Sequence, residues 1–394
     1  MKRKQLTFFV SAIASISIVS ACSFSPENKM TERIPEDSVA PTKNQKETKK
    51  EDIPDSTASD KTTINKLKHV PYDQSIGKVN TYNLSSFFKD RVVTIAPEFI
   101  HKNHIFYYDN REGHKNLIYR YDMNKKQNIS IYSTSKQFGM MTGTNSALFW
   151  LELDEPTEVG IKWAVMKMDV ETKQVKKLDS GESRFQTMPP YIEVANGKAT
   201  WITHDATETE TISYLKTFSL LKNKTSTLQT FKLKEGEQRE GIFPFDYRES
   251  DAGLIIHKST FKKGNKNPTL ETKDGTYKQA MNGLIDFDRG VNYVALGQEG
   301  KALFQNIHNP KNNLEFLTSD PRLTADAFNF ISPNRVVFRE GMNQLFYADL
   351  KKKTVSPLTS YDETTTKPKL VDNRLIYAVS GLHNIKFKVL TLKK

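Results

Sequence analysis

Short apolar and aromatic runs, separated by polar turns, recur along the chain from Val70 onward. Each run starts with a polar residue suited to a turn and continues with β-branched and aromatic residues, as in Asn103–Tyr108 and Asn373–Tyr377. Runs of this length and composition predict β-strands, and no long stretch of helical periodicity accompanies them. The sequence therefore predicts an all-β domain over residues 70–394.

These runs form an internal repeat. Five further phrases of the same kind start at Asn145, Asn196, Asp251, Arg289 and Asn334. The mean interval between the seven starts is 45 residues, with individual intervals from 38 to 55. Second strands follow clearly in four copies, and polar hairpin tips lead to third strands in Asp169–Leu178 and Asp349–Leu358. Several antiparallel strands at a period of about 40–50 residues indicate the blades of a β-propeller, in which neighbouring blades cover each other's faces.

The repeat resembles the TolB-type and WD40-like periplasmic propellers over about residues 90–394. The likeness rests on Asp109–Gly113 followed by Ile118-Tyr119, and on the Leu-Thr pairs at 317–318 and 358–359. These motifs are shared by many propellers, so the resemblance implies the fold and no particular activity.

The number of blades follows from the phrases. Seven phrases predict about seven blades, and six or eight stay open because residues 243–284 are hard to divide. We expect Val92–Ile95 to pair with the last blade and close the ring, which would remove exposed sheet edges. A two-sheet sandwich is the alternative for a chain rich in strands, but a sandwich requires no such repeat.

A different pattern opens the chain. Lys2, Arg3 and Lys4 precede Leu6–Val19, an apolar run without charge. The run is too short to cross ~30 Å of hydrocarbon with ease, and it has the length and flanks of a secretory signal core. It ends in Val19-Ser20-Ala21-Cys22, where small residues suit the cleft of a signal peptidase and the cysteine offers a thiol.

This stretch resembles the signal of bacterial lipoproteins, whose lipobox reads aliphatic, small, small, Cys. The resemblance implies that residues 1–21 are a signal peptide and that the acylated Cys22 carries a thioether-linked diacylglycerol. Two acyl chains anchor a protein stably in a membrane. A plain secretory signal, or an N-terminal membrane helix with a chance cysteine, is the alternative. Cys22 is the only cysteine, which excludes an internal disulfide and a cysteine-based zinc cluster.

The segment after Cys22 has the composition of a tether. Residues 23–69 contain nine Lys+Arg and nine Asp+Glu, with Phe24 as the only aromatic residue. Such a segment buries too little apolar surface to offset its chain entropy, so we predict that residues 22–69 are a lipidated cysteine and a disordered tether. A segment that binds the membrane surface or the wall is the alternative, but its zero net charge argues against that.

Charge narrows the classes of partner. The chain has 58 Lys+Arg against 46 Asp+Glu, a formal net charge of +12. This excess could favour an anionic wall polymer or lipid, but it is spread along the sequence, which is typical of a solvated surface. Nucleic acid is not an expected partner, because no aromatic and basic binding motif is evident. We also expect a monomer.

Motifs of the common enzyme classes are absent from the sequence. It contains no Gly-x-Ser-x-Gly elbow, no phosphate-binding or dinucleotide-binding glycine motif, and no His-Glu-x-x-His. We therefore predict no catalytic residue, no cofactor and no metal ligand, and Cys22, as the lipidation site, is the one site residue predicted.

Two groups of residues have part of the pattern of a metal site. His101 and His104 lie close together in the sequence, but two ligands do not complete a coordination sphere. Asp286-Phe287-Asp288-Arg289-Gly290 has part of the rhythm of a calcium loop but lacks its distal glutamate. A solvated turn is the simpler interpretation of each.

Acidic and aromatic residues offer two further candidates. Asp154-Glu155 and the pair Glu208 and Glu210 could serve a glycosidase only if carboxylates converge in space. Three tryptophans fall inside strand phrases, which favours packing over stacking on a ligand: Trp150, Trp163 and Trp201.

Taken together, these features predict a lipid-anchored propeller on the extracytoplasmic face of a cell membrane. We expect a binding or scaffolding module of the cell envelope, with the membrane as one partner and an envelope protein, peptide or glycan as another. A carbohydrate-active hydrolase or lyase with its site at the propeller funnel is the alternative. It requires acids, His or Tyr side chains to meet at the axis. A third possibility is an accessory subunit of a membrane complex, which requires a broad exposed apolar patch.

Overall fold

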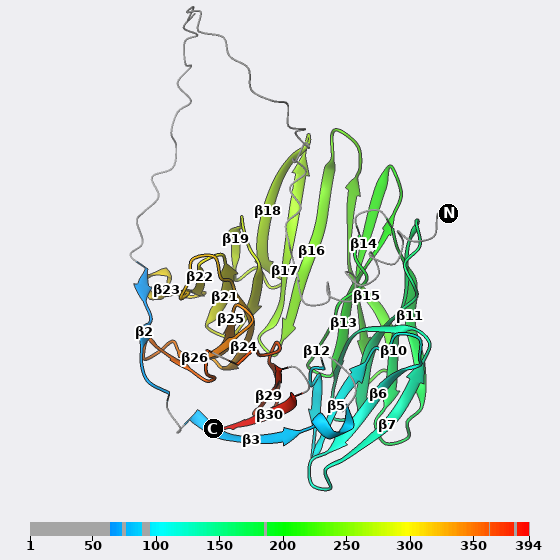
Figure 1. Cartoon of the computed structure of the whole chain (residues 1–394). Coiled ribbons are helices and arrows are strands. Elements are labelled where there is room, and N and C mark those ends of the chain that lie inside the picture. Colours follow the sequence, from blue (N-terminus) through cyan, green and yellow to red (C-terminus); the bar gives the residue numbers. More distant parts are fainter. Residues whose placement is uncertain are drawn as a thin grey trace, which may run out of the picture.

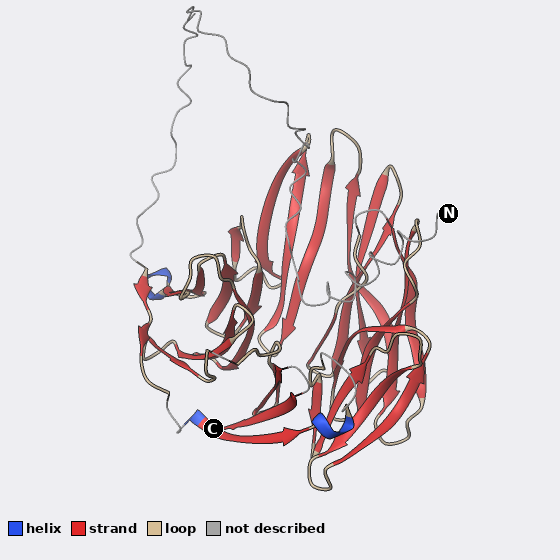
Figure 2. Cartoon of the chain, in the orientation of Figure 1, coloured by secondary structure: helices blue, strands red, loops and turns tan. Residues whose placement is uncertain are grey.

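A computed structural model of the chain describes residues 64–72, 76–88, 95–184, 187–361, 363–381 and 384–393. The predicted signal peptide, Cys22 and most of the predicted tether lie outside the described residues. Nearly all of the regular structure is β-strand, with two short 3-10 helices, η2 (Ser85–Phe87) and η3 (Pro310–Asn312) (Figure 2).

The strands group into four-stranded antiparallel units that follow one another along the chain (Figure 1). Unit 1 consists of β4 (Phe99–His101), β5 (His104–Asp109), β6 (Asn116–Asp122) and β7 (Gln127–Thr134). Unit 2 consists of β8 (Gln137–Gly143), β9 (Ala147–Leu153), β10 (Gly160–Asp169) and β11 (Val175–Arg184). Unit 3 consists of β12 (Ile192–Ala195), β13 (Lys198–Ala206), β14 (Glu210–Ser219) and β15 (Lys224–Lys234). Unit 4 consists of β16 (Glu240–Ser250), β17 (Gly253–Lys262), β18 (Asn265–Thr272) and β19 (Lys278–Ala280).

The remaining units have the same order of strands. Unit 5 consists of β20 (Asp286–Arg289), β21 (Tyr293–Gln298), β22 (Lys301–Asn306) and β23 (Leu314–Leu317). Unit 6 consists of β24 (Ala325–Ser332), β25 (Arg335–Glu340), β26 (Gln344–Asp349) and β27 (Thr354–Pro357). Unit 7 joins β28 (Lys369–Val371), β29 (Arg374–Gly381) and β30 (Asn384–Leu392) to β3 (Gly77–Asn83), which comes from the start of the domain. The described residues thus form seven four-stranded units, two of which merge into one eight-stranded sheet.

The seven repeated phrases mark the second strand of each unit. They coincide with β5, β9, β13, β17, β21, β25 and β29. These strands are buried on both faces: six consecutive residues of β9, Ala147–Glu152, are buried. A strand covered by neighbours on both sides reads as a continuous apolar run, which explains why these phrases were the clearest signal in the sequence.

Apolar clusters hold consecutive units together. One cluster joins Trp163 of unit 2 to Trp201 of unit 3, and another joins Ile256 of unit 4 to Leu215 of unit 3. The same arrangement links units 1 and 2, 4 and 5, 5 and 6, and 6 and 7. The units therefore pack face to face around a ring, as the blades of a propeller do.

The ring closes between its first and last units. Ile105 and Tyr107 of unit 1 share a buried cluster with Ile376 and Phe387 of unit 7. The N-terminal strand β3 pairs with β30 from Gly77↔Leu392 to Asn83↔Lys386, so both ends of the domain contribute to one sheet. Residues 92–94, which we expected to close the ring, lie outside the described residues, and Ile95 is not in a strand.

The chain enters the fold along the outer edge of the ring. Two short strands, β1 (Asn65–Lys66) and β2 (Lys68–His69), pair in parallel with β23 and β27. Leu67 between them is buried with units 5 and 6, and the ring of His69 lies 5.5 Å from that of Phe316. Strand structure is therefore present at residues 65–69, inside the predicted tether, because this edge offers backbone partners and an apolar cluster that composition alone does not reveal.

Units 3 and 4 contain the longest strands, β15 and β16, with 11 residues each. Strands β13 to β18 rise above the ring and form a continuous wall (Figure 1). The two units join through Leu233↔Gly241 and Lys234↔Glu240 of β15 and β16. Gly241 has a φ of +128°, and a side chain there would collide with the carbonyl oxygen of Lys232, so glycine permits this junction.

The prediction of an all-β propeller is confirmed. Within the described part of the chain, no helix is long and apolar enough to cross a membrane.

Candidate functional site

The first strands of all seven units surround one large cavity. Its volume is about 2780 Å³, and its lining includes residues of β4, β8, β12, β16, β20, β24 and β28. The lining also takes in the turns after these strands, such as Asn196-Gly197, and connections between units, such as Thr187–Pro190. These turns and connections belong to opposite ends of the first strands, so the cavity extends along the axis of the ring.

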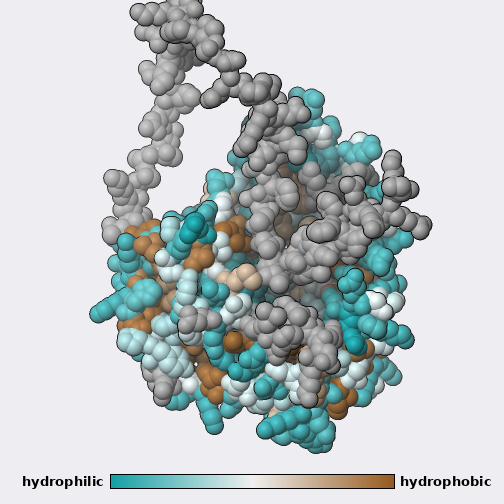
Figure 3. Space-filling view, viewed as in Figure 1, coloured by the Kyte–Doolittle hydropathy of each residue, from teal (hydrophilic) through white to brown (hydrophobic). Residues whose placement is uncertain are grey.

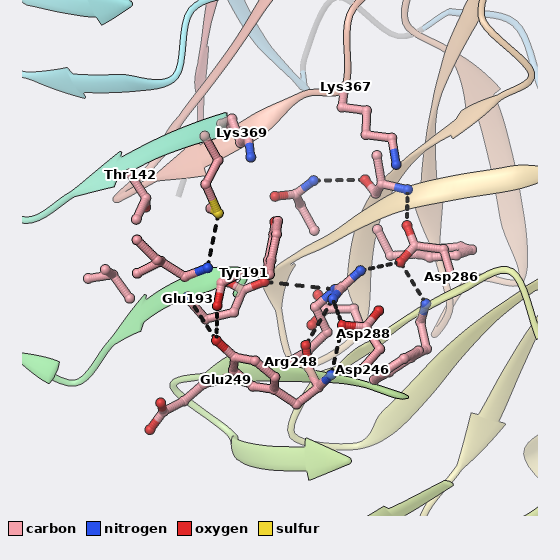
Figure 4. A pocket seen from close by; sticks show the side chains of 18 of the residues that line it. Thr142, Tyr191, Glu193, Asp246, Arg248, Glu249, Asp286, Asp288, Lys367 and Lys369 are labelled. Atoms are coloured by element: carbon pink, nitrogen blue, oxygen red, sulfur yellow. Dashed lines mark hydrogen bonds and ion pairs between the residues drawn. The ribbon is translucent and has the colours of Figure 1, made fainter. Parts of the chain in front are cut away.

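Ionisable side chains meet at the centre of this cavity. We call them the axial charge cluster, and they come from five units: Glu98, Glu193, Asp246, Arg248, Asp286, Asp288 and Lys369. All of them except Glu98 are labelled in Figure 4. On β16 and β20 these residues follow the alternation of a strand, which points every second side chain to the same face. The axial cavity is therefore lined by ionisable groups, whereas a ring with a purely structural role could have an apolar axis.

Arg248 is the hub of the cluster. Its guanidinium nitrogens lie 2.8 Å from Oδ1 of Asp246 and 2.8 Å from Oδ1 of Asp286, and Nε lies 3.8 Å from Oε1 of Glu193. The guanidinium carbon also lies 5.3 Å from the ring centroid of Tyr191 and 5.1 Å from that of Phe287. Arginine suits this place because its planar group can serve several carboxylates and stack on aromatic rings at once.

Asp286 is held in its ionised form. Its carboxylate accepts the backbone N–H of Ala327 at 2.6 Å and that of Phe287 at 2.9 Å, in addition to Arg248. Burial opposes ionisation, but the charge of Arg248 and these hydrogen bonds outweigh it and lower the pKa of Asp286. Ala327 has a φ of +54°, which is unfavourable for a residue with a side chain. The backbone is therefore strained at the residue that donates its N–H to Asp286.

In two other acids of the cluster, the pKa is raised and not lowered. Burial raises the pKa of Glu193 to about 7, although Arg248 and Lys369 oppose it. Burial also raises the pKa of Asp288 to about 8, helped by the charge of Glu193. Oδ1 of Asp288 accepts the N–H of Arg289, its neighbour in the chain, at 2.8 Å. The cluster thus contains acids that exchange protons near neutral pH beside one, Asp286, that stays charged.

These shifts predict how stability depends on pH. An acid whose pKa is higher in the folded than in the unfolded state binds more protons when folded, so stability falls as pH rises through that interval. We expect the free energy of unfolding to drop between pH 6 and pH 9 by more than about 1.4 kcal/mol, the equivalent of one pKa unit. Asp288→Asn should remove much of this drop and be more stable than the wild type at pH 9. Urea unfolding at several pH values measures this, and parallel curves for both proteins would contradict it.

The histidines weighed as metal ligands lie away from the cluster. His101 and His104 face each other across β4 and β5, where Nδ1 of His101 is 3.1 Å from Oδ1 of Asn145. Nε2 of His104 is 3.5 Å from Oδ2 of Asp122. Among the described residues, no group of three or more His, Cys, Asp or Glu side chains is arranged to hold a metal ion.

The other candidates are dispersed. Asp154 pairs with Lys136 at 2.9 Å, and Glu208 and Glu210 lie in and beside the β13–β14 turn; none of these acids lines the axial cavity. The tryptophans are buried in clusters between units, as predicted: Trp150, Trp163 and Trp201. The residues weighed as a calcium loop form β20 and its following turn, and this strand brings Asp286 and Asp288 to the axis.

Most of the axial charge cluster was not identified from the sequence. A signal existed, because charged residues at a spacing of two stand shortly before several of the repeated phrases. Examples are Asp246 and Arg248 before Asp251, and Lys367 and Lys369 before Asn373. Such a pattern shortly before a buried second strand indicates an inner strand with one polar face.

No protein-family model and no curated protein matches the chain. Several solved structures have a similar shape. The β-propeller domain of the Trilobed protease from Pyrococcus furiosus is 10% identical, with a TM-score of 0.51 over 75% of this chain and 94% of that one. The polysaccharide lyase Uly1 is 9% identical, with a TM-score of 0.50 over 83% and 100%. YCF48 bound to D1 peptide is 12% identical, with a TM-score of 0.48 over 83% and 98%. At such identities the likeness concerns the fold alone, and by its fold the protein is a β-propeller.

Proposed function

We propose that this protein is a ligand-binding module of the bacterial cell envelope, anchored to the outer face of the cell membrane through a lipidated Cys22. The observation that supports ligand binding is the axial cavity, into which five units direct ionisable side chains. A large cavity with a few convergent polar groups is the usual form of a binding site.

The chemistry of the cluster favours a ligand rich in hydroxyl groups. Carboxylates accept hydrogen bonds from hydroxyls, and protonated acids donate them, so Glu193 and Asp288 can do both near neutral pH. Tyr191 lines the same cavity and adds an aromatic surface beside these acids. Glycans offer hydroxyls and apolar ring faces together, and we propose an envelope glycan as the ligand.

Substitution of the acids tests this proposal. The immobilised full chain should retain glycan fragments released from bacterial envelopes, and the double variant Glu193→Gln, Asp288→Asn should lose that retention. Glu171→Gln is the matched control, since Glu171 is exposed and outside the cavity. Equal retention by all three proteins, or none by the wild type, would refute the proposal.

The membrane anchor has its own prediction. Cys22→Ser should move the protein from the membrane fraction to the soluble fraction almost completely, because the sequence has no other cysteine to acylate. Metabolic labelling with an alkyne-bearing fatty acid followed by fractionation measures this. A labelled Cys22→Ser protein, or one that stays in the membrane, would show that another feature anchors the chain.

A second function is favoured by the contrasting acids. Asp286 is held ionised while the pKa of Asp288 is raised to about 8, and such a pair can divide the roles of base and acid in catalysis. One chain of similar shape is a polysaccharide lyase, which agrees with a carbohydrate-active hydrolase or lyase. Incubation with the retained glycan distinguishes the two functions: shortened products that require Asp288 would establish an enzyme.

An accessory role in a membrane complex would require a broad apolar patch. On the face shown in Figure 3, the hydrophobic and hydrophilic residues of the described part are interspersed.

A further inference from the structure

The raised wall of units 3 and 4 presents an aromatic and basic surface to the same cavity. Phe245 on β16, His257 on β17 and Lys266 on β18 all line it, and we call these three residues the wall platform. The ring centroids of Phe245 and His257 are 5.5 Å apart, and Nζ of Lys266 lies 4.7 Å from the centroid of Phe245. Three adjacent strands thus place a flat ring, an imidazole and a cation side by side.

A β-bulge turns Phe245 toward the cavity. The register of β16 against β17 passes from Pro244↔Lys258 to Asp246↔His257, which leaves Phe245 without a partner residue. Its side chain stays 43% exposed, while Pro244 is buried. Bulges redirect side chains and are frequent beside binding sites. The exposed ring of Phe245 therefore depends on a local change in the backbone, whereas an aromatic residue exposed by chance needs no such change.

The platform has one free positive charge. Lys266 is exposed and forms no ion pair within the described residues. Burial and the charge of Lys266 lower the pKa of His257 to about 4, so this ring is neutral at pH 7. Nε2 of His257 is buried and has no hydrogen-bond partner among the described residues. The platform therefore combines an apolar face with an unpaired cation and an unsatisfied polar atom.

The platform adjoins the axial charge cluster. Phe245 is followed directly by Asp246, and the ring of His257 lies 6.2 Å from that of Phe287, on which Arg248 also stacks. A ligand that rests on the platform can therefore extend toward the cluster. The two parts differ in charge, since the platform is cationic and the cluster is rich in acids.

We infer that the wall platform binds an acidic sugar unit of the glycan, with one ring face on Phe245 and its carboxylate paired with Lys266. This inference rests on the proposed glycan-binding function and names the class of glycan. The C–H face of a sugar ring packs on an aromatic ring, and a carboxylate forms a charge-assisted hydrogen bond with an ammonium group. Hydroxyls of the neighbouring sugar then reach the acids of the cluster.

An acidic peptide is the competing ligand, and the chemistry of the cluster argues against it. Peptides often bind by adding a strand to a free sheet edge, and β16 offers one beside Phe245, because it pairs with β15 only through Glu240 and Gly241. A peptide would, however, bring carboxylates toward Glu193 and Asp288 without the hydroxyls that those acids can bind.

Calorimetry with defined oligosaccharides tests the inference on the full chain. The probes are oligosaccharides containing glucuronate, galacturonate or N-acetylmuramate, each compared with its carboxyl-reduced neutral form. We expect at least one acidic probe to bind about tenfold or more tightly than its neutral form, the effect of one charge-assisted contact. Lys266→Met should remove this difference, and Phe245→Ala should weaken both forms by about three- to tenfold.

Matched controls separate the possible results. Lys262→Met removes an exposed lysine on the same wall that does not line the cavity, and it should leave binding unchanged. Neutral oligosaccharides that bind through Glu193, with no effect of Lys266→Met, would overturn the inference and leave the proposed function standing. Binding of none of the probes, or preferential binding of a poly-glutamate peptide, would overturn the inference as well.

Discussion

Replacing Arg248 by methionine is expected to destabilise the protein by about 3–5 kcal/mol, the usual cost of removing one partner from a buried ion pair. Arg248 neutralises Asp246 and Asp286 directly and lies 3.8 Å from Glu193. Asp286 has only 5% of its side chain exposed, so water cannot replace the lost charge. The destabilisation should be smaller at low pH, where the acids can take up protons. Urea unfolding of both proteins at pH 5 and at pH 8 measures the difference in the free energy of unfolding at each pH.

An exposed pair gives the matched control. Arg322 pairs with Asp320 at 2.6 Å, but 85% of the arginine side chain is exposed. Arg322→Met should change the free energy of unfolding by about 0.5 kcal/mol or less. If Arg248→Met cost no more than Arg322→Met, the axial charge cluster would not be a buried network.

Replacing Phe387 by alanine is expected to cost about 3–5 kcal/mol, as for other large aromatic residues in well-packed cores. Phe387 is fully buried where the last unit meets the first, and its ring lies 5.2 Å from that of Tyr107 in unit 1. A cavity at this junction removes contacts on both sides of the ring closure. Chemical denaturation of the variant measures the loss.

Phe87→Ala is the control for this change, because Phe87 is near the same junction but 43% exposed. It should cost about 1 kcal/mol or less, as most substitutions at exposed positions do. A comparable small cost for Phe387→Ala would mean that the first and last units do not pack against each other in solution.

The second strands could be predicted from the sequence because of where they lie in the fold. In β9 and β25, for example, neighbouring units cover both faces, so the residues Leu148–Leu151 and Val336–Phe338 form uninterrupted apolar runs. Outer strands such as β7 have mostly exposed or half-buried residues and carried a weaker signal. Ring closure by β3 could not be predicted, because its residues are mostly polar and its pairing depends on β30, about 300 residues away.

The functional site was harder to predict for the same physical reason. Inner strands such as β12 and β20 are only four residues long, with a polar face toward the axis. Asp286 and Asp288 drew attention as part of a calcium loop, but their role depends on Arg248, 38 residues earlier in the chain. Convergence of side chains from separate units is a property of the closed ring and of no single segment.

The structure of the full chain with bound oligosaccharide tests most directly whether the axial cavity is the functional site. The probe would be the acidic oligosaccharide that binds most tightly in calorimetry. We predict sugar density inside the cavity, with hydroxyls within hydrogen-bond distance of Glu193 and Asp288. Sugar bound to the outer strands, or a cavity without sugar at saturating concentration, would contradict this prediction.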